Sequence, residues 1–128
     1  MKKQIVQTQN APQPVGPYNQ AVKFGNLLFI SGQIALKVDG SSLIGQSIEA
    51  ETHQVMINIV AILHKVNLEL DDVLKISIFM KDLSQFSKVN DTYGSYFSAD
   101  TAPARETVEV SQLPKDANIE ISVIAGIS

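Results

Sequence analysis

Two charged side chains near the end of the chain stand in segments that otherwise have the pattern of buried β-strands. Arg105, the only arginine, begins the alternating segment 104–110, and Glu120 lies within the apolar segment 119–123. Burying a charge is costly unless the charge is paired or used. Arginine can grip a carboxylate through two hydrogen bonds, and glutamate can orient water or move a proton. A ligand with a carboxylate and a reactive proton is therefore one candidate partner.

The alternation of side chains along these strands also permits a simpler interpretation. A period of two places Thr107 on the same face as Arg105, and Ser122 on the same face as Glu120. Such polar faces are common where an antiparallel sheet meets solvent or another subunit. Taken alone, the alternation favours a solvated glutamate and an arginine paired at an interface.

Composition limits the classes of protein to be considered. A chain of 128 residues with 45% hydrophobic side chains predicts one globular domain, residues 1–128. There is no cysteine, so we expect neither a disulfide nor a Cys-based zinc site, and the pattern indicates no metal or cofactor. The net charge of −3 and the scattered lysines argue against nucleic-acid binding. We expect no membrane span, no secretory signal and a cytoplasmic location.

Hydrophobic periodicity and turn residues predict the elements that position the two charges. Ser47 has the features of a helix N-cap, with acidic residues in the turn after it. Gly25-Asn26 suits a tight hairpin turn. The predicted elements, in chain order, are a short strand near 4–7, a hairpin of 21–24 and 27–31, a loop at 35–45, a helix from 48 to about 66, a strand at 73–80, a helix from about 83 to 97, and the two final strands.

The motifs that accompany these elements resemble the RidA (YjgF) family of reactive-intermediate enamine/imine deaminases over nearly the full length. The matching segments are Gly16-Pro17-Tyr18, Ile30-Ser31-Gly32-Gln33, Val89-Asn90 with Tyr93, Pro103-Ala104-Arg105 with Val108-Glu109-Val110, and Leu113-Pro114-Lys115-Asp116 with Ile119-Glu120-Ile121. The resemblance implies an α+β, chorismate-mutase-like fold: a mixed sheet of about six strands with two helices on one face. It also implies a homotrimer with clefts between subunits, and a last strand that lies antiparallel between two earlier parallel ones.

The resemblance further implies an activity and a set of site residues. Such proteins hydrolyse 2-imino acids, formed from enamines such as 2-aminoacrylate and 2-aminocrotonate, to 2-keto acids and ammonia. By resemblance, Arg105 would anchor the substrate carboxylate and Glu120 would position water. The remaining expected contacts to small 2-imino or 2-keto acids come from Tyr18, Ser31, Gly32, Asn90 and Thr107.

Two positions depart from the family pattern. Position 107 is often cysteine in the family and is Thr107 here, and position 106 is often small and is Glu106 here. By alternation Glu106 should point away from Arg105.

Two other functions stay open at this point: a small-carboxylate-binding regulator without turnover, and an endoribonuclease or translation inhibitor. The absence of a basic patch speaks against the latter.

Overall fold

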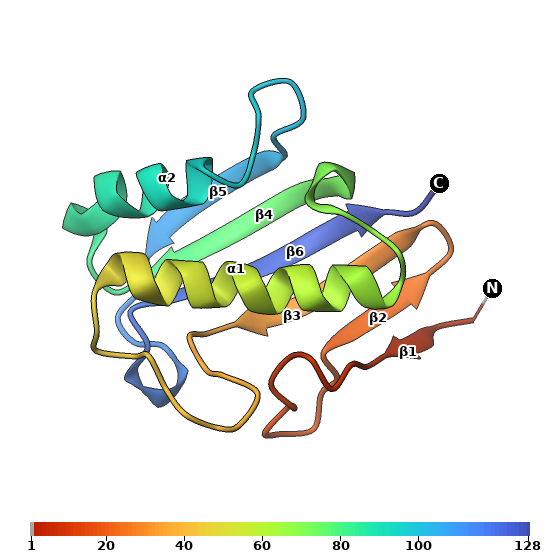
Figure 1. The fold of residues 1–128 in the computed structure, drawn as a ribbon, viewed down its shortest axis with the longest axis horizontal. Helices are drawn as coiled ribbons and strands as arrows, with labels where there is room; N and C mark the ends of the chain where they lie inside the picture. The colour runs from red at the N-terminus through yellow and green to blue at the C-terminus, as the bar shows by residue number, and fades with distance from the viewer. Residues whose placement is uncertain (1) are drawn as a thin grey trace.

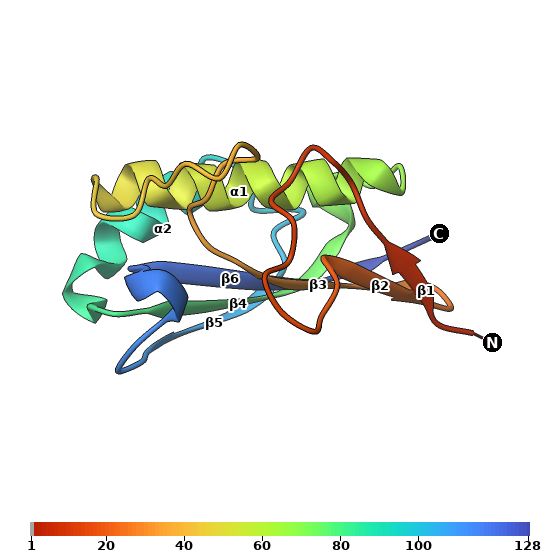
Figure 2. The same ribbon diagram turned by 90° about the horizontal axis from the view of Figure 1, so that it is seen from below.

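A mixed β-sheet forms one layer of the molecule and two helices form the other (Figures 1 and 2). The structure is a computed structural model that describes residues 2–128. The strands are β1 (Gln4–Val6), β2 (Ala21–Phe24), β3 (Leu27–Gln33), β4 (Val73–Met80), β5 (Ala104–Glu109) and β6 (Ile119–Gly126). The helices are α1 (Ile48–Lys65) and α2 (Phe86–Gly94), with single 3-10 turns at Leu70–Asp72, Leu83–Gln85 and Pro114–Asp116.

The sheet has the strand order β1-β2-β3-β6-β4-β5. Strands β4 and β5 pair in parallel, whereas β6 runs antiparallel to both β3 and β4. The last strand therefore lies between two parallel strands, as predicted, and each pair of parallel strands is connected through a helix. This arrangement confirms the predicted α+β fold of six strands with both helices on one face.

Helix α1 begins where the sequence predicts it. The Ser47 hydroxyl accepts the Ala50 N–H at 3.0 Å, and Glu49 and Glu51 occupy the first turn, where the helix dipole favours acids. The inner side of α1 is fully buried and packs on the sheet. Its largest buried side chains are Met56, Ile59, Ile62 and Leu63. This helix therefore supplies much of the apolar core that fixes β3 and β6 beneath it.

Helix α2 is shorter than the predicted range of 83–97. A 3-10 turn, capped by the Asp82 carboxylate on the Ser84 N–H, precedes it, and the α-helix ends at Gly94. Glycine is a poor helix former, and the Ser95 hydroxyl takes the Thr92 carbonyl oxygen as its acceptor at 2.6 Å. These two residues account for the early end that the apolar spacing alone could not predict.

The opposite face of the sheet is not covered by a helix (Figure 2). Several large apolar side chains on that face are exposed between 38% and 48%: Phe24, Leu27, Phe29 and Val108. Phe29 lies in register with Ile124 of β6, so the apolar surface continues from one strand to the next. Val108 lies apart from these side chains, on β5 at the other edge of the sheet. An exposed apolar patch such as that of Phe24, Leu27 and Phe29 is typical of a surface that another chain covers.

Candidate functional site

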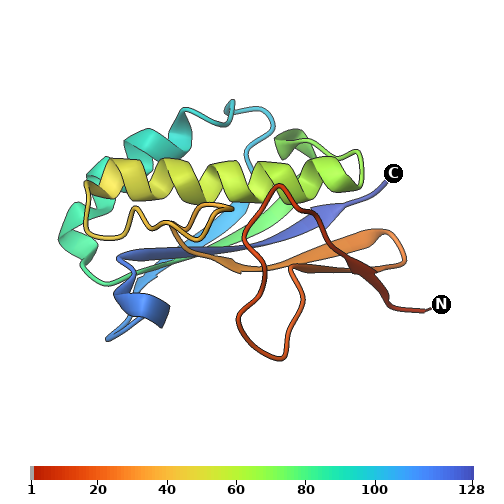
Figure 3. The ribbon, with the colours of Figure 1, turned by 60° about the horizontal axis from the view of Figure 1, so that its bottom comes forward.

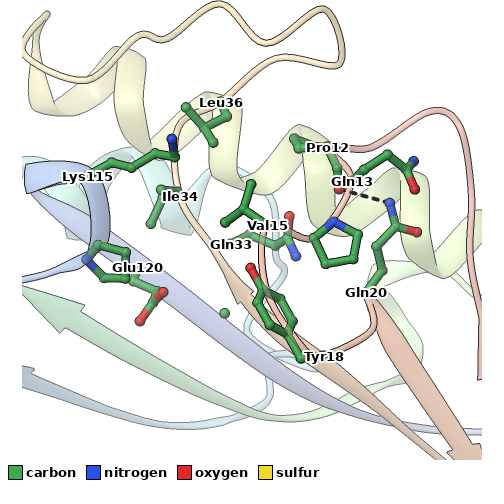
Figure 4. Close-up of a pocket in the computed structure, with 13 residues that line it drawn as sticks. Pro12, Gln13, Val15, Tyr18, Gln20, Gln33, Ile34, Leu36, Lys115 and Glu120 are labelled. Atoms are coloured by element: carbon green, nitrogen blue, oxygen red, sulfur yellow. Dashed lines mark hydrogen bonds between the residues drawn. The ribbon is translucent and has the colours of Figure 1, made fainter.

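A pocket forms around Glu120 at the end of the sheet near the Pro114–Asp116 turn (Figure 4). Its cavity volume is about 90 Å³, and it opens to solvent. Its walls are mainly apolar, with Val15, Ile34 and Pro114 among the lining residues. Glu120 and Lys115 bring charges to this lining. A small pocket with apolar walls and few polar groups is the usual form of a small-molecule site.

The loop between β1 and β2 makes one wall of this pocket. The loop runs from the helix layer past the sheet edge to the uncovered side (Figure 3). The buried Gln20 side chain holds it, because its Oε1 accepts the Thr8 N–H at 2.7 Å and its Nε2 donates to the carbonyls of Thr8, Ala11 and Pro12. Tyr18 lines the pocket on this loop, and the Ser31 hydroxyl donates to the Asn19 carbonyl at 2.6 Å.

Glu120 is half-buried in this pocket, and burial raises the pKa of its carboxyl above the usual value. The Glu120 side chain lies against Gly32 of β3, where the pairing of β3 with β6 shifts register between Ile30 and Gln33. A carboxyl in such surroundings holds its proton more readily, so its carboxylate is a stronger base toward water.

Arg105 lies in a different group of residues, on the side of β5 that faces α2. Its guanidinium carbon is 4.9 Å from the Tyr93 ring centroid and 5.6 Å from that of Phe86. Asn90 follows Phe86 by four residues and so lies on the same side of α2. Within residues 2–128, Arg105 forms no ion pair with a carboxylate. Aromatic contacts therefore support the cation and leave its N–H donors for another partner.

Two buried hydroxyls accompany Arg105. The Thr107 Oγ1 and the Tyr93 hydroxyl are enclosed, and neither forms a hydrogen bond within the part of the chain that the structure describes. Burial raises the pKa of Tyr93, and the charge of Arg105 offsets part of that rise. Buried polar groups usually have partners, so these two hydroxyls distinguish this side of β5 from an ordinary packed surface.

Arg105 and Glu120 lie on opposite faces of the sheet. Arg105 is in register with Ile76, whose buried side chain faces the helices, whereas Glu120 is in register with Phe79 of the same strand. Since Ile76 and Phe79 are three positions apart, their side chains point to opposite faces. Within one subunit, the predicted site residues are therefore divided into two separate groups. Tyr18, Ser31, Gly32 and Glu120 make one group, and Asn90, Arg105 and Thr107 make the other.

Glu106 points away from Arg105, as the alternation predicts. Its carboxylate accepts a hydrogen bond from the Ser77 hydroxyl and pairs with the Lys75 ammonium at 3.0 Å. Both partners lower the pKa of Glu106, the hydroxyl contributing most. The additional acid is therefore satisfied on the uncovered face, and does not compete for the Arg105 guanidinium.

The sequence alone indicates no role for some residues that the structure places in these groups. Phe86 and Tyr93 support Arg105, and their spacing of seven residues in a helix would have placed them on one face. Lys115 lines the Glu120 pocket from a turn in which it and Asp116 have left-handed φ angles of 54° and 58°. An ion pair between Lys81 and Asp116 holds this turn, and no local pattern in the sequence indicates that geometry.

Two classes of feature are absent from residues 2–128. No group of three or more His, Cys, Asp and Glu side chains there is arranged to hold a metal ion. In the same residues, neither helix has both the length and the apolar character that crossing a bilayer requires.

Comparison with known proteins assigns the chain to a family. The family model described as Endoribonuclease L-PSP matches residues 8–127. A RutC family protein of Pyrococcus horikoshii is 46% identical over 123 residues, which cover 96% of this chain and 97% of that protein. A 2-iminobutanoate/2-iminopropanoate deaminase of Dermatophagoides farinae is 38% identical over 125 residues, with 98% of this chain and 97% of the relative covered.

The fold is shared with solved structures across the whole chain. The crystal structure of TdcF from E. coli with bound serine superposes with a TM-score of 0.90 at 35% sequence identity. The superposition covers 98% of this chain and 99% of TdcF. The six-stranded sheet with two helices on one face is thus the common architecture of these proteins.

Proposed function

The chain belongs to the RidA (YjgF) family, and we propose that it is a deaminase that hydrolyses 2-imino acids to 2-keto acids and ammonia. The substrates we propose are the imines of 2-aminoacrylate and 2-aminocrotonate. The observation that carries the proposal is that two charged side chains, Arg105 and Glu120, have no structural role in the part of the chain that the structure describes that explains them. Arg105 rests on two aromatic rings without a carboxylate partner among the described residues, and Glu120 is half-buried in a pocket. The bound serine of the TdcF structure, itself a small amino carboxylic acid, supports a ligand of this class.

In this proposal Arg105 holds the substrate carboxylate through two hydrogen bonds. The planar guanidinium matches a carboxylate, and its stacking on Tyr93 and Phe86 restricts its orientation before substrate binds. Asn90 and Thr107 complete this side of the site. Fixing the carboxylate places the imine carbon at one position, which lowers the entropic cost of the attack by water.

Glu120 activates the water that attacks the imine carbon. Its carboxylate takes one proton as the water oxygen forms its bond to carbon. That proton passes to the nitrogen, which completes the carbinolamine. The Glu120 carboxylate then takes the hydroxyl proton and delivers it to the same nitrogen as the C–N bond breaks, so ammonia and the 2-keto acid leave. Glu120 ends as a carboxylate again, so the cycle needs no further reactant. Such a proton transfer contributes about 10²–10⁴-fold, which is sufficient for an imine that already hydrolyses in water.

A homotrimer brings the two groups together. Because Arg105 and Glu120 are on opposite faces of one sheet, a site that uses both must combine Arg105 of one subunit with Glu120 of another. The exposed apolar side chains of the uncovered face, Phe24, Leu27, Phe29 and Val108, offer a surface for such contacts. Their burial in an interface would stabilise the assembly through the hydrophobic effect.

The test combines a coupled assay with subunit mixing. A dehydratase generates 2-aminocrotonate, and release of 2-ketobutyrate is timed with and without the protein. We expect Arg105→Ala and Glu120→Gln to be inactive separately. After denaturation and refolding together at equal amounts, we expect about a quarter of wild-type activity, because three-quarters of random trimers are mixed and each has one intact cleft of three. No recovery on mixing would contradict the intersubunit site.

Two other functions make different predictions in the same experiment. A carboxylate-binding regulator binds 2-ketobutyrate in calorimetry but leaves its release unchanged in the coupled assay. An endoribonuclease, the activity in the family model's description, cleaves RNA that is added to the protein. Turnover of the imine together with intact RNA would exclude both functions as the main activity.

A further inference from the structure

We propose that Glu51, in the first turn of α1, is a positioning residue that sets the location of Glu120. This inference rests on the deaminase function proposed above. Glu51 is fully buried, with an exposed fraction of 0%, and it lies in neither of the two groups of site residues. A buried carboxylate is costly unless its oxygens are satisfied, so the contacts of Glu51 indicate what it holds in place.

The Glu51 carboxylate joins three separate parts of the chain. Its Oε1 accepts the backbone N–H of Asn118 at 3.2 Å, and its Oε2 accepts the side-chain amide N–H of Asn118 at 2.6 Å. Oε2 also accepts the Gly45 N–H at 3.3 Å. All the partners are donors, and a carboxylate is the side chain that accepts from all of them at once. Helix α1, the loop before it and the start of β6 are thereby connected.

The Asn118 backbone is held on both sides. Its N–H bonds to Glu51, and its carbonyl oxygen accepts the Lys81 N–H at 3.2 Å. Asn118 precedes Glu120 by two residues, so the position of the Asn118 backbone sets the position of the Glu120 side chain on β6. It also follows the Pro114–Asp116 turn, whose left-handed Lys115 lines the same pocket. Glu51 thus fixes one wall of the pocket and the proposed water-activating group together.

This role predicts a specific kinetic signature. Arg105 lies on β5, on the other face of the sheet, and none of the Glu51 contacts reaches it. Displacing Glu120 should therefore lower kcat while leaving carboxylate binding in place. A misplacement of about 1 Å costs on the order of 10²-fold in rate. A purely structural role would instead reduce the amount of folded protein without changing kcat for each folded site.

The decisive experiment exchanges the two partners. Glu51→Met removes every acceptor, and Asn118→Asp places two carboxylates against each other, so we expect kcat to fall by about tenfold to 10²-fold in each. In the double variant, Glu51→Gln with Asn118→Asp, the introduced amide oxygen at position 51 still accepts the backbone N–H of residue 118. The amide nitrogen donates to the carboxylate at position 118 and no longer accepts the Gly45 N–H, whose 3.3 Å bond is the longest of the three. We expect kcat to recover to within about twofold of wild type.

The control variant is Thr52→Val, in the same turn of α1. Thr52 is also fully buried, but its hydroxyl bonds only to the Ile48 carbonyl of its own helix, at 2.7 Å. Loss of that bond should lower thermal stability without lowering kcat. Calorimetry with 2-ketobutyrate should give the same Kd for every variant, because Arg105 is unchanged.

The outcomes separate this inference from the proposed function. If wild type does not speed the release of 2-ketobutyrate, the deaminase proposal fails, and hydrogen exchange at residues 113–120 still tests the connection to Glu51. Faster exchange there in Asn118→Asp, restored in the double variant, supports the positioning role. If wild type is active and Glu51→Met keeps its kcat, the inference is wrong. If Glu51→Met does not fold, the double variant decides instead. A double variant that is no more active than Asn118→Asp alone would also show that the inference is wrong.

Discussion

The backbone of Gly32 and the carboxyl group of Glu120 are so close that no side chain fits between them. A Cβ atom on residue 32 would lie 2.7 Å from the Glu120 carboxyl carbon and 2.9 Å from its Oε2. The approach occurs where β3 and β6 shift register, between Ile30 and Gln33. Glycine at this position therefore lets a strand backbone pass directly beside the proposed water-activating group.

Gly32→Ala tests this contact. The added methyl group must displace the Glu120 side chain or the β3 backbone, and overpacking of this kind costs about 1–3 kcal/mol of stability. We expect turnover to fall further than stability alone explains, because the carboxylate itself moves. The measurements are the unfolding free energy in urea and kcat for the imine.

Gly94→Ala is the matched control for that substitution. A Cβ there meets nothing within 4 Å, and Gly94 ends α2 on the surface. Alanine should raise stability by up to about 1 kcal/mol, since glycine is the poorer helix former. Wild-type kcat in Gly32→Ala would show that Glu120 does not need its present position.

Arg105→Ala should abolish carboxylate capture. Truncating one partner of a desolvated charge pair costs about 2–5 kcal/mol, which is tens-fold to thousands-fold in affinity at about 1.4 kcal/mol per decade. Arg105→Lys should recover little, because an ammonium lacks the two-pronged geometry and stacks less well on Tyr93. Calorimetry with 2-ketobutyrate measures both variants. Equal affinity of wild type and Arg105→Ala would show that the acid binds elsewhere.

The sequence predicts much of the fold because its signals are local. The Ser47 cap, the apolar period of α1 and the alternation of β4 from Ile76 to Met80 each depend on neighbouring residues, and each is confirmed in the structure. The alternation also predicts Leu74 on the buried face, which is wrong: Leu74 is 52% exposed, because β4 shifts register between Val73 and Lys75. The family resemblance also predicts that β6 lies between β3 and β4, which local sequence patterns do not indicate.

The relation between the two site groups could not be predicted in the same way. Alternation within a strand fixes which side chains share a face, but not whether Arg105 and Glu120 face the same side. That depends on register across β4. The contact between Gly32 and Glu120 likewise depends on a register shift, and the Glu51 contact spans 67 residues of sequence.

Thr107→Val asks whether the hydroxyl at this position has a function. In the described chain the Thr107 Oγ1 is buried without a partner, so an isosteric methyl group removes an unsatisfied polar atom. Doing so is neutral or stabilises by up to about 1 kcal/mol, and valine suits a strand. If the substrate contacts only backbone atoms here, kcat should not change. A loss of both stability and turnover would show that the assembled protein gives this hydroxyl a partner.

Glu120→Gln should separate binding from turnover and should change the pH dependence of both rate and stability. Burial raises the pKa of Glu120 above its usual value of 4.5. Water is activated by the carboxylate, so the catalysed rate, after subtraction of the uncatalysed hydrolysis, should fall as pH drops through that raised pKa. Glutamine keeps the size and a hydrogen-bonding oxygen, so 2-ketobutyrate should still bind while turnover and its acid limb are lost.

The same raised pKa fixes the sign of the stability change. The folded state disfavours the charged carboxyl, so Glu120 lowers stability above its folded pKa, and this penalty disappears below the unfolded pKa, where both states are protonated. Glu120→Gln should therefore unfold at a higher temperature than wild type at pH 7 and at a similar temperature near pH 4. Thermal unfolding at both pH values measures this, beside kcat. A Glu120→Gln variant that turns over like wild type would leave Arg105 and backbone positioning as the whole of the catalysis.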